Sequence, residues 1–146
     1  MKVVVQRVKQ ASVSVDNEII SKIDNGLMLL VSFNINDKEE VLEYMVNKIL
    51  KLRIFDDVNN IMNKNILDVG GSVLSVSQFT LYGDTKKSNR PSYTKCMGGD
   101  NASILYDKFN YLLNMSVPVK TGRFKTHMEV SLINDGPVTI ILEKEL

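Results

Sequence analysis

The sequence has very few of the side chains on which most catalytic centres and metal sites depend. Among its 146 residues there is one cysteine, Cys96, one histidine, His127, and no tryptophan. A single cysteine leaves no internal disulfide framework and no multi-cysteine metal site. A histidine-activated nucleophile or a histidine metal ligand would have to be His127, which we expect to lie exposed on a strand. We therefore expect no metal and no other cofactor.

An excess of charge and long apolar runs are also missing. The formal net charge is +1, whereas proteins that grip a long duplex through many phosphates are strongly basic. A nucleic-acid partner would therefore touch only a small footprint. Two basic stretches could supply it, unless they are simply solvated loops: Lys86, Lys87, Arg90 and Lys95, and then Lys120, Arg123 and Lys125. No apolar run approaches the ~20 residues that span a bilayer, and the first residues are too polar for a signal peptide. We expect a cytoplasmic protein with no membrane partner.

What is present is the composition of an ordinary globular protein. Hydrophobic residues make up 44% and charged residues 24% of the chain, close to the averages for folded domains. A chain of this length fits one domain and buries enough surface to fold without a disulfide or a metal. We expect residues 1–146 to form a single domain.

Apolar periodicity predicts two helices among about seven strands. Residues 38–51 show helical spacing behind Asp37 and Glu40, which resemble a capping box. Asp100 or Asn101 is expected to cap a second helix, whose apolar face would be Ile104, Leu105, Phe109, Leu112 and Leu113. Strands are predicted at 1–8, 12–20 (a hairpin turning at Asp16-Asn17), 27–33, 52–55, 73–81, 128–132 and 138–143. Such strands, joined mostly by short turns, predict an α+β fold with a barrel-like sheet covered by helices.

Two polar segments interrupt the predicted strands. Within residues 75–81, alternation would place Ser75, Ser77 and Phe79 on one face of a strand, and hydroxyl groups buried there must find hydrogen-bond partners. The simplest alternative is that these hydroxyls only bond to neighbouring backbone. The second segment is Asn134-Asp135-Gly136-Pro137, which reads as a hairpin turn. An X-Pro bond is the usual place for a cis peptide, although only ~5–6% of such bonds are cis.

Several motifs occur in a fixed order along the chain, at residues 5–8, 11–13, 51–55, 67–71, 76–82, 90–92, 119–124 and 128–139. With these motifs the sequence resembles the D-aminoacyl-tRNA deacylase family over nearly its whole length. The most specific are Ser-Gln-Phe-Thr at 77–80 and Asn-x-Gly-Pro-Val-Thr at 134–139. One local departure is Lys125-Thr126-His127, where the family commonly has small residues and an acid.

The resemblance implies a fold, an activity and a site. The fold would be a barrel-like mixed sheet packed by two main helices, and the activity hydrolysis of D-aminoacyl-tRNA, and of glycine mischarged on tRNA, by a homodimer. The site would contain Ser77, Gln78, Phe79 and Thr80, while a cis Gly136-Pro137 dipeptide would reach into the partner's pocket and exclude L-amino acids. Supporting roles would fall to Arg7, which helps to hold the Gly-Pro loop, and to Met128 and Asn134.

The scarcity of bases suggests a mechanism in which the RNA takes part. The 2′-hydroxyl beside the ester can act as nucleophile or proton shuttle, so that backbone N–H groups near Phe79 and Thr80 need only stabilise the oxyanion. Thr80 is the candidate nucleophile if a covalent intermediate forms. Two other hypotheses stay open at this point: a dimer that binds RNA 3′ ends without chemistry, and an esterase that uses Ser75 or Ser77 as nucleophile.

Overall fold

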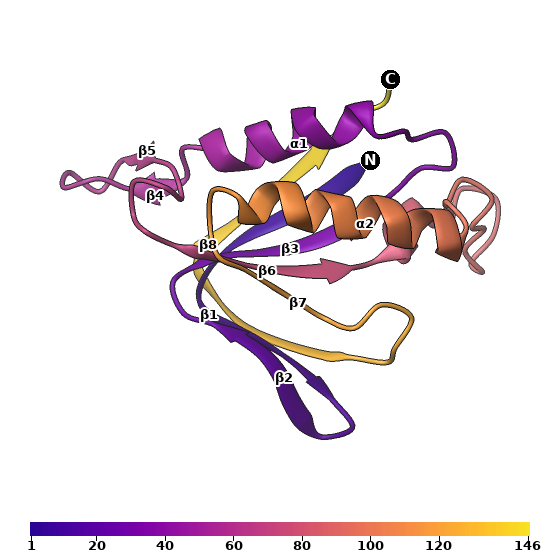
Figure 1. Ribbon diagram of the computed structural model, residues 1–146, viewed down its shortest axis with the longest axis horizontal. Coiled ribbons are helices and arrows are strands. Elements are labelled where there is room, and N and C mark those ends of the chain that lie inside the picture. The colour runs from indigo at the N-terminus through magenta and orange to yellow at the C-terminus, as the bar shows by residue number, and fades with distance from the viewer.

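A computed structural model describes all 146 residues, and one curved sheet dominates it (Figure 1). The elements follow in the order β1 (Lys2–Val15), β2 (Glu18–Ile23), β3 (Gly26–Ser32), α1 (Glu40–Lys51), β4 (Phe55–Asp56), β5 (Met62–Lys64), β6 (Ser72–Ser77), a 3-10 turn η1 (Phe79–Tyr82), α2 (Gly99–Asn114), β7 (Val119–Thr121) and β8 (Glu129–Glu143). Neither helix is long and apolar enough to cross a membrane.

The six-stranded sheet is mixed and nearly closed. Its strand order is β2-β1-β3-β6-β7, with β8 also paired to β1, while β4 and β5 form a separate ribbon. The β3–β6 and β6–β7 pairs are parallel, and the other pairs of the large sheet are antiparallel. Its two ends meet where the Ser21 hydroxyl on β2 donates to the carbonyl of Thr121 on β7, at 2.5 Å. The expected barrel-like mixed sheet is therefore confirmed.

The core lies on both faces of this sheet. Both helices cover the same face (Figure 1), and a cluster of 22 buried residues, including Phe109 of α2, fills the space beneath them. A second cluster of seven buried residues, including Met28 and Leu74, lies on the opposite face inside the curl of the strands. Burial on both faces explains why β3 reads as a continuous apolar run rather than as an alternating strand.

The helices are where we expected them, but their ends are not. Helix α1 begins at Glu40 after Glu39, with no side-chain cap. The predicted capping box is wrong because Asp37 is occupied elsewhere: its Oδ2 accepts from the Asn34 N–H at 2.7 Å and lies 2.5 Å from the amino group of Met1.

Helix α2 begins at Gly99, with Gly98 in the N-cap position, so the predicted caps Asp100 and Asn101 lie inside its first turn. Its buried face contains Tyr106 and Asn110, whereas the expected Ile104 is 63% exposed. Tyr106 bonds to the Ser75 carbonyl of the sheet, a contact that a purely apolar periodicity does not reveal.

Strand boundaries differ from the sequence prediction in three places. The strands predicted at 1–8 and at 12–15 are one strand, β1, although the hairpin turn at Asp16-Asn17 is confirmed. The predicted strand 52–55 is only Phe55–Asp56. The strand predicted at 73–81 ends at Ser77, so the predicted strand position of Phe79 is wrong: Phe79 and Thr80 both lie in the 3-10 turn.

The predicted hairpin at residues 134–137 is also wrong. Residues 129–143 run in one direction as a single strand, β8, which pairs with β1 on either side of residues 135–138. Gln6 of β1 pairs with Thr139 of β8, and Val8 of β1 pairs with Asn134. Two positions along β1 therefore correspond to five positions along β8. The extra residues bulge out of the ladder, which is how an interruption is accommodated without reversing the chain.

Candidate active site

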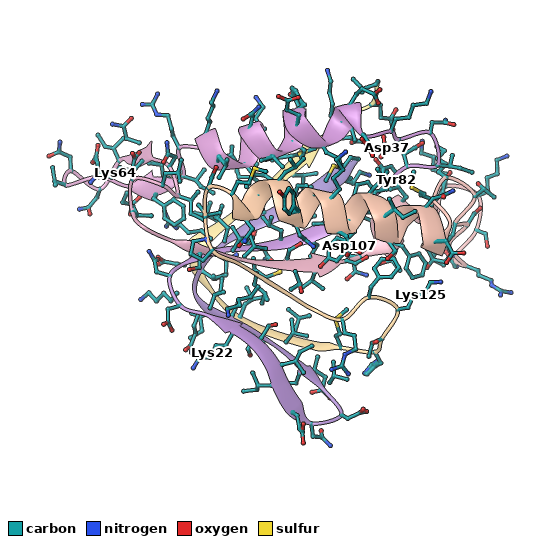
Figure 2. The ribbon with its side chains drawn as sticks, viewed as in Figure 1. Lys22, Asp37, Lys64, Tyr82, Asp107 and Lys125 are labelled. Atoms are coloured by element: carbon teal, nitrogen blue, oxygen red, sulfur yellow. The ribbon has the colours of Figure 1, made fainter.

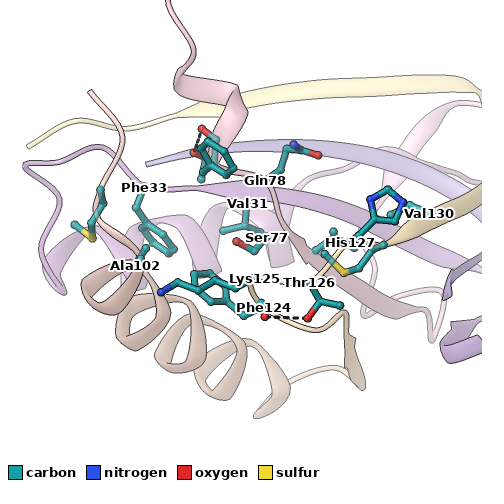
Figure 3. Close-up of a pocket in the computed structure, with 16 residues that line it drawn as sticks. Val31, Phe33, Ser77, Gln78, Ala102, Phe124, Lys125, Thr126, His127 and Val130 are labelled. Atoms are coloured by element: carbon teal, nitrogen blue, oxygen red, sulfur yellow. Dashed lines mark hydrogen bonds between the residues drawn. The ribbon is translucent and has the colours of Figure 1, made fainter. Parts of the chain in front are cut away.

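A pocket of about 640 Å³ opens between the end of β6, the start of α2 and the segment that leads into β8 (Figure 3). Sixteen residues line it, nine of them hydrophobic. They are Val31, Ser32, Phe33, Val76, Ser77, Gln78, Phe79, Met97, Gly99, Ala102, Phe124, Lys125, Thr126, His127, Met128 and Val130. An apolar cavity with a few polar groups converging on it is the usual form of a small-ligand site.

Three of the four residues of the Ser-Gln-Phe-Thr motif line this pocket. Ser77 is the last residue of β6, and Gln78 and Phe79 follow as the chain turns into η1. Thr80 is exposed and is not among the lining residues; its hydroxyl instead accepts a hydrogen bond from the Gln78 amide. The pairing of β6 with β3 ends here. Its last hydrogen bond runs from the Gln78 N–H to the Val31 carbonyl, at 2.8 Å.

The 3-10 turn leaves backbone donors next to the pocket-lining residues Gln78 and Phe79. Its first internal hydrogen bond runs from the Leu81 N–H to the Gln78 carbonyl, at 3.3 Å, and no side chain caps it. The N–H groups of Phe79 and Thr80 therefore have no partner within the turn, as at any helix start. Such N–H groups can bind an anionic oxygen.

The carbonyl of Phe79 is held by two side chains from other parts of the chain. The Ser32 hydroxyl at the end of β3 and the Cys96 thiol each donate to it at 3.3 Å. Because a trans peptide is planar, fixing this carbonyl also fixes the direction of the Thr80 N–H. The sequence showed no role for Ser32, which lies within the apolar run 27–33, or for Cys96, which follows the polar residues Thr94 and Lys95.

A buried polar contact supports the pocket from below. The Tyr106 hydroxyl of α2 donates to the Ser75 carbonyl at 2.8 Å, and the same carbonyl accepts from the Gly122 N–H at 3.1 Å. The Tyr106 ring stacks on Phe124 with 5.9 Å between centroids. Burial raises the pKa of Tyr106, so it stays a hydroxyl donor at neutral pH. Ser75 is fully buried beneath the pocket, which leaves it unsuited to act as a nucleophile.

His127 and Met128 lie at the pocket rather than in a strand. The chain is irregular from Gly122 to Met128, and β8 begins only at Glu129. His127 is exposed, as we expected, but it is on a loop and lines the pocket (Figure 3). Met128 lines the pocket as well, and its sulfur accepts from the Arg123 N–H at 3.3 Å. No group of three or more histidine, cysteine or acidic side chains could hold a metal ion.

Gly136 and Pro137 occupy the bulge of β8 and do not line the pocket of their own chain. The peptide bond between them is cis. Gly136 has a φ of +139°, which favours glycine, and a β-carbon there would lie 2.8 Å from Val138 and 3.0 Å from the Arg7 guanidinium.

Two side chains hold this bulge. Arg7, of which 7% is exposed, donates from Nε to the Asp135 carbonyl at 2.8 Å and from Nη1 to the Ile54 carbonyl at 2.7 Å. Asn134 closes the bulge by accepting from the Val138 N–H at 2.7 Å and donating to the Thr139 hydroxyl at 3.1 Å. The dipeptide is therefore presented on an edge of the sheet, away from the pocket.

Solved structures of similar shape define the class of fold. One, described as "c-Myc DNA Unwinding Element Binding Protein", has a TM-score of 0.95 and 40% identity, with full coverage of both chains. Another, described as "Structural Analysis of a probable eukaryotic D-amino acid tRNA deacylase", has a TM-score of 0.83 and 18% identity over 97% of each chain. Residues 4–143 match the family described as D-Tyr-tRNA(Tyr) deacylase. The chain belongs to this family of hydrolases, which act on D-aminoacyl-tRNA.

Proposed function

We propose that the pocket binds the aminoacylated terminal adenosine of tRNA and hydrolyses the ester of D-amino acids and of glycine. The observation that carries this proposal is the coincidence of an apolar pocket with Ser77, Gln78 and the uncapped start of η1. The chain would act as one domain in the cytoplasm, where charged tRNA is found, and would need no cofactor.

The chemistry would use few protein groups. Water attacks the ester carbonyl carbon, the carbonyl oxygen takes the electron pair, and the N–H groups of Phe79 and Thr80 stabilise it. Donors of this kind contribute about 3–4 kcal/mol each to the transition state. The neighbouring 2′-hydroxyl accepts the proton of the water and returns one to the leaving 3′-oxygen, so free amino acid and tRNA result. His127 is not needed as a base in this scheme.

Chirality would be selected by exclusion. We place the partner subunit's Gly136 and Pro137 at the mouth of the pocket, where their backbone would collide with an L side chain but leave room for a D side chain. Glycine has no side chain and would not be excluded. Arg7 and Asn134 hold these residues outside the pocket of their own chain. This position supports a site that is shared between two subunits.

The free edge of β8 supports a homodimer. This strand pairs only with β1, so its other edge is open over 15 residues. Ile133 and Ile141 on it are 48% and 67% exposed. A long open edge with exposed apolar side chains is a surface that proteins normally cover.

The deciding experiment is a deacylation assay with D-tyrosyl-, L-tyrosyl- and glycyl-tRNA, alongside a D-tyrosyl-tRNA whose terminal adenosine lacks the 2′-hydroxyl. We expect release from the D and glycyl substrates, none from the L substrate, and a large loss with the 2′-deoxy substrate. A Thr80→Ala variant should keep most of its activity, whereas covalent catalysis by Thr80 would abolish it. Equal rates on D- and L-tyrosyl-tRNA would contradict selection by exclusion, and an intact ester throughout would contradict hydrolysis itself.

A second candidate is nucleic-acid binding without chemistry. It is favoured by the similar structure with 40% identity, which is described as a DNA unwinding element binding protein. The net charge of +1 speaks against a large duplex footprint. A binder would shift single-stranded DNA or RNA on a gel and leave the aminoacyl ester intact.

A further inference from the structure

The rim of the pocket differs in character from its interior. Of the sixteen lining residues, three are exposed, and these form the rim: Phe79, Lys125 and His127. The interior is apolar apart from hydroxyl and amide groups, and no carboxylate lines any part of the pocket. The only permanently charged side chain in the lining is therefore the ammonium group of Lys125, at the opening.

Lys125 lies on the loop that leads into β8, beside the start of α2. Its backbone has a φ of +57°, a left-handed conformation that costs a non-glycine residue of order 1–3 kcal/mol. Its side chain crosses the start of α2, where a β-carbon on Gly99 would collide with the Lys125 side chain. The ammonium lies 3.6 Å from Asp100, but 63% of the Lys125 side chain and all of the Asp100 side chain are exposed, so this ion pair contributes little. Lys125 is therefore available to another anion.

The substrate proposed above carries its negative charge in one kind of group. The ester and the nucleoside are neutral, and the amino group of the amino acid is cationic. The phosphodiester that joins the terminal adenosine to the preceding nucleotide is an anion, and it must leave the pocket past the rim. An exposed aromatic pair, Phe79 and Tyr93 with 5.2 Å between ring centroids, lies beside this exit. A cation beside exposed rings is the usual surface for single-stranded nucleic acid.

We propose that Lys125 binds the phosphodiester on the 5′ side of the terminal adenosine, so that the rim distinguishes aminoacyl-tRNA from a free aminoacyl-adenosine. This proposal rests on the proposed function. Lys125 would be a binding residue for the RNA and would take no part in breaking the ester.

The test compares D-tyrosyl-tRNA with D-tyrosyl-adenosine, which has the same ester but no phosphate. For Lys125→Ala we expect KM for the tRNA to rise about 3- to 5-fold, the upper part of the range for an exposed ion pair, with kcat unchanged. Neither constant should change for D-tyrosyl-adenosine, and Lys125→Arg should restore the KM for the tRNA. The dependence of log(kcat/KM) on log salt concentration should weaken by about 0.7, the value for one phosphate of a single strand.

The structure offers matched controls. Lys22 on β2 and Lys64 on β5 lie far from Lys125 (Figure 2), and neither lines the pocket. Lys22→Ala and Lys64→Ala should therefore leave both substrates unaffected. Gly99→Ala keeps the charge but displaces the Lys125 side chain, so it should raise KM for the tRNA in the same direction as Lys125→Ala.

Two results would overturn the proposal. One is a Lys125→Ala enzyme that behaves like the unaltered protein on both substrates, and the other is an equal loss on both, which would place Lys125 at the ester. Thermal unfolding of each variant identifies any loss caused by misfolding. Failure of the proposed function looks different, because the unaltered protein would then hydrolyse neither substrate.

Discussion

Replacing Arg7 by lysine tests whether the guanidinium fork, rather than its charge, holds the bulge of β8. Arg7 is buried, and its two bonds to the carbonyls of Asp135 and Ile54 leave from different nitrogens of the fork. Lysine keeps the charge but is a single point, so it can serve one of these carbonyls and not both. The carboxylate of Asp56 lies 3.3 Å from Arg7, but its side chain is 46% exposed, so this ion pair adds little to the stability of the protein with arginine or with lysine at position 7.

The magnitude follows from the number of bonds lost. A hydrogen bond from a charged donor contributes about 1.5–3 kcal/mol, and a carbonyl left buried without a partner costs a similar amount. We expect Arg7→Lys to lower the free energy of unfolding by about 2 kcal/mol. The corresponding alanine variant should lose about 3–5 kcal/mol, the usual effect of breaking a buried charged contact. These are large fractions of a total of roughly 5–15 kcal/mol.

The measurement is urea unfolding, with Arg53→Lys as the control. Arg53 also donates to a backbone carbonyl, that of Asn63 at 3.1 Å, but it is exposed. At an exposed position the substitution should change stability by less than about 1 kcal/mol. Equal losses for Arg7→Lys and Arg53→Lys would refute the argument from burial. Since the bulge presents Gly136, the Arg7 variant should also lose deacylase activity under conditions in which it is fully folded.

Three further predictions concern the sheet, the support of the pocket and the lone thiol. Gly26→Ala should lower the free energy of unfolding by about 3 kcal/mol, because the added methyl group would overlap a carbonyl of β6. Gly98→Ala is the control: its methyl group would meet no atom within 4 Å, so urea unfolding should give an unchanged free energy. Tyr106→Phe removes a donor to the Ser75 carbonyl and should cost about 1 kcal/mol in thermal unfolding; an unchanged melting temperature would show that the bond does not contribute. Because burial raises the pKa of the Cys96 thiol, its thiolate fraction at about pH 8 is below that of free cysteine. Cys96 should therefore react more slowly than free cysteine with iodoacetamide, and a faster reaction would contradict the partly buried position of the thiol.

The sequence was enough to predict which segments are helical and most of the strands. The helical spacing of residues 38–51 and the continuous apolar run at 27–33 reflect burial, which is a local signal repeated along the chain. The turn at Asp16-Asn17 is likewise local, because both residues take the left-handed conformation that asparagine and aspartate tolerate. The family was also accessible, since its Ser-Gln-Phe-Thr and Asn-x-Gly-Pro-Val-Thr motifs are short and contiguous.

The tertiary structure decided how those motifs are used. Residues 134–137 have the composition of a turn, and only pairing with β1 on both sides keeps them in one strand as a bulge. Asp37 has the spacing of a helix cap, yet the nearby amino group of Met1 competes for its carboxylate. Ser32 and Phe79 are distant in sequence and meet because β3 and β6 are paired in parallel, while a bridge between Asn34 and Cys96 brings the thiol beside them.

The chemistry of the site shows the same division. From the residues alone, Ser75, Ser77 and Thr80 were three candidate nucleophiles on one predicted strand. The fold buries Ser75 under Tyr106, leaves Ser77 at the pocket and turns Thr80 outward. These fates depend on where β6 ends, and it ends at Ser77 because the partner strand β3 itself ends at Ser32. A strand end set by its neighbour is a non-local property, which no pattern within residues 75–81 contains.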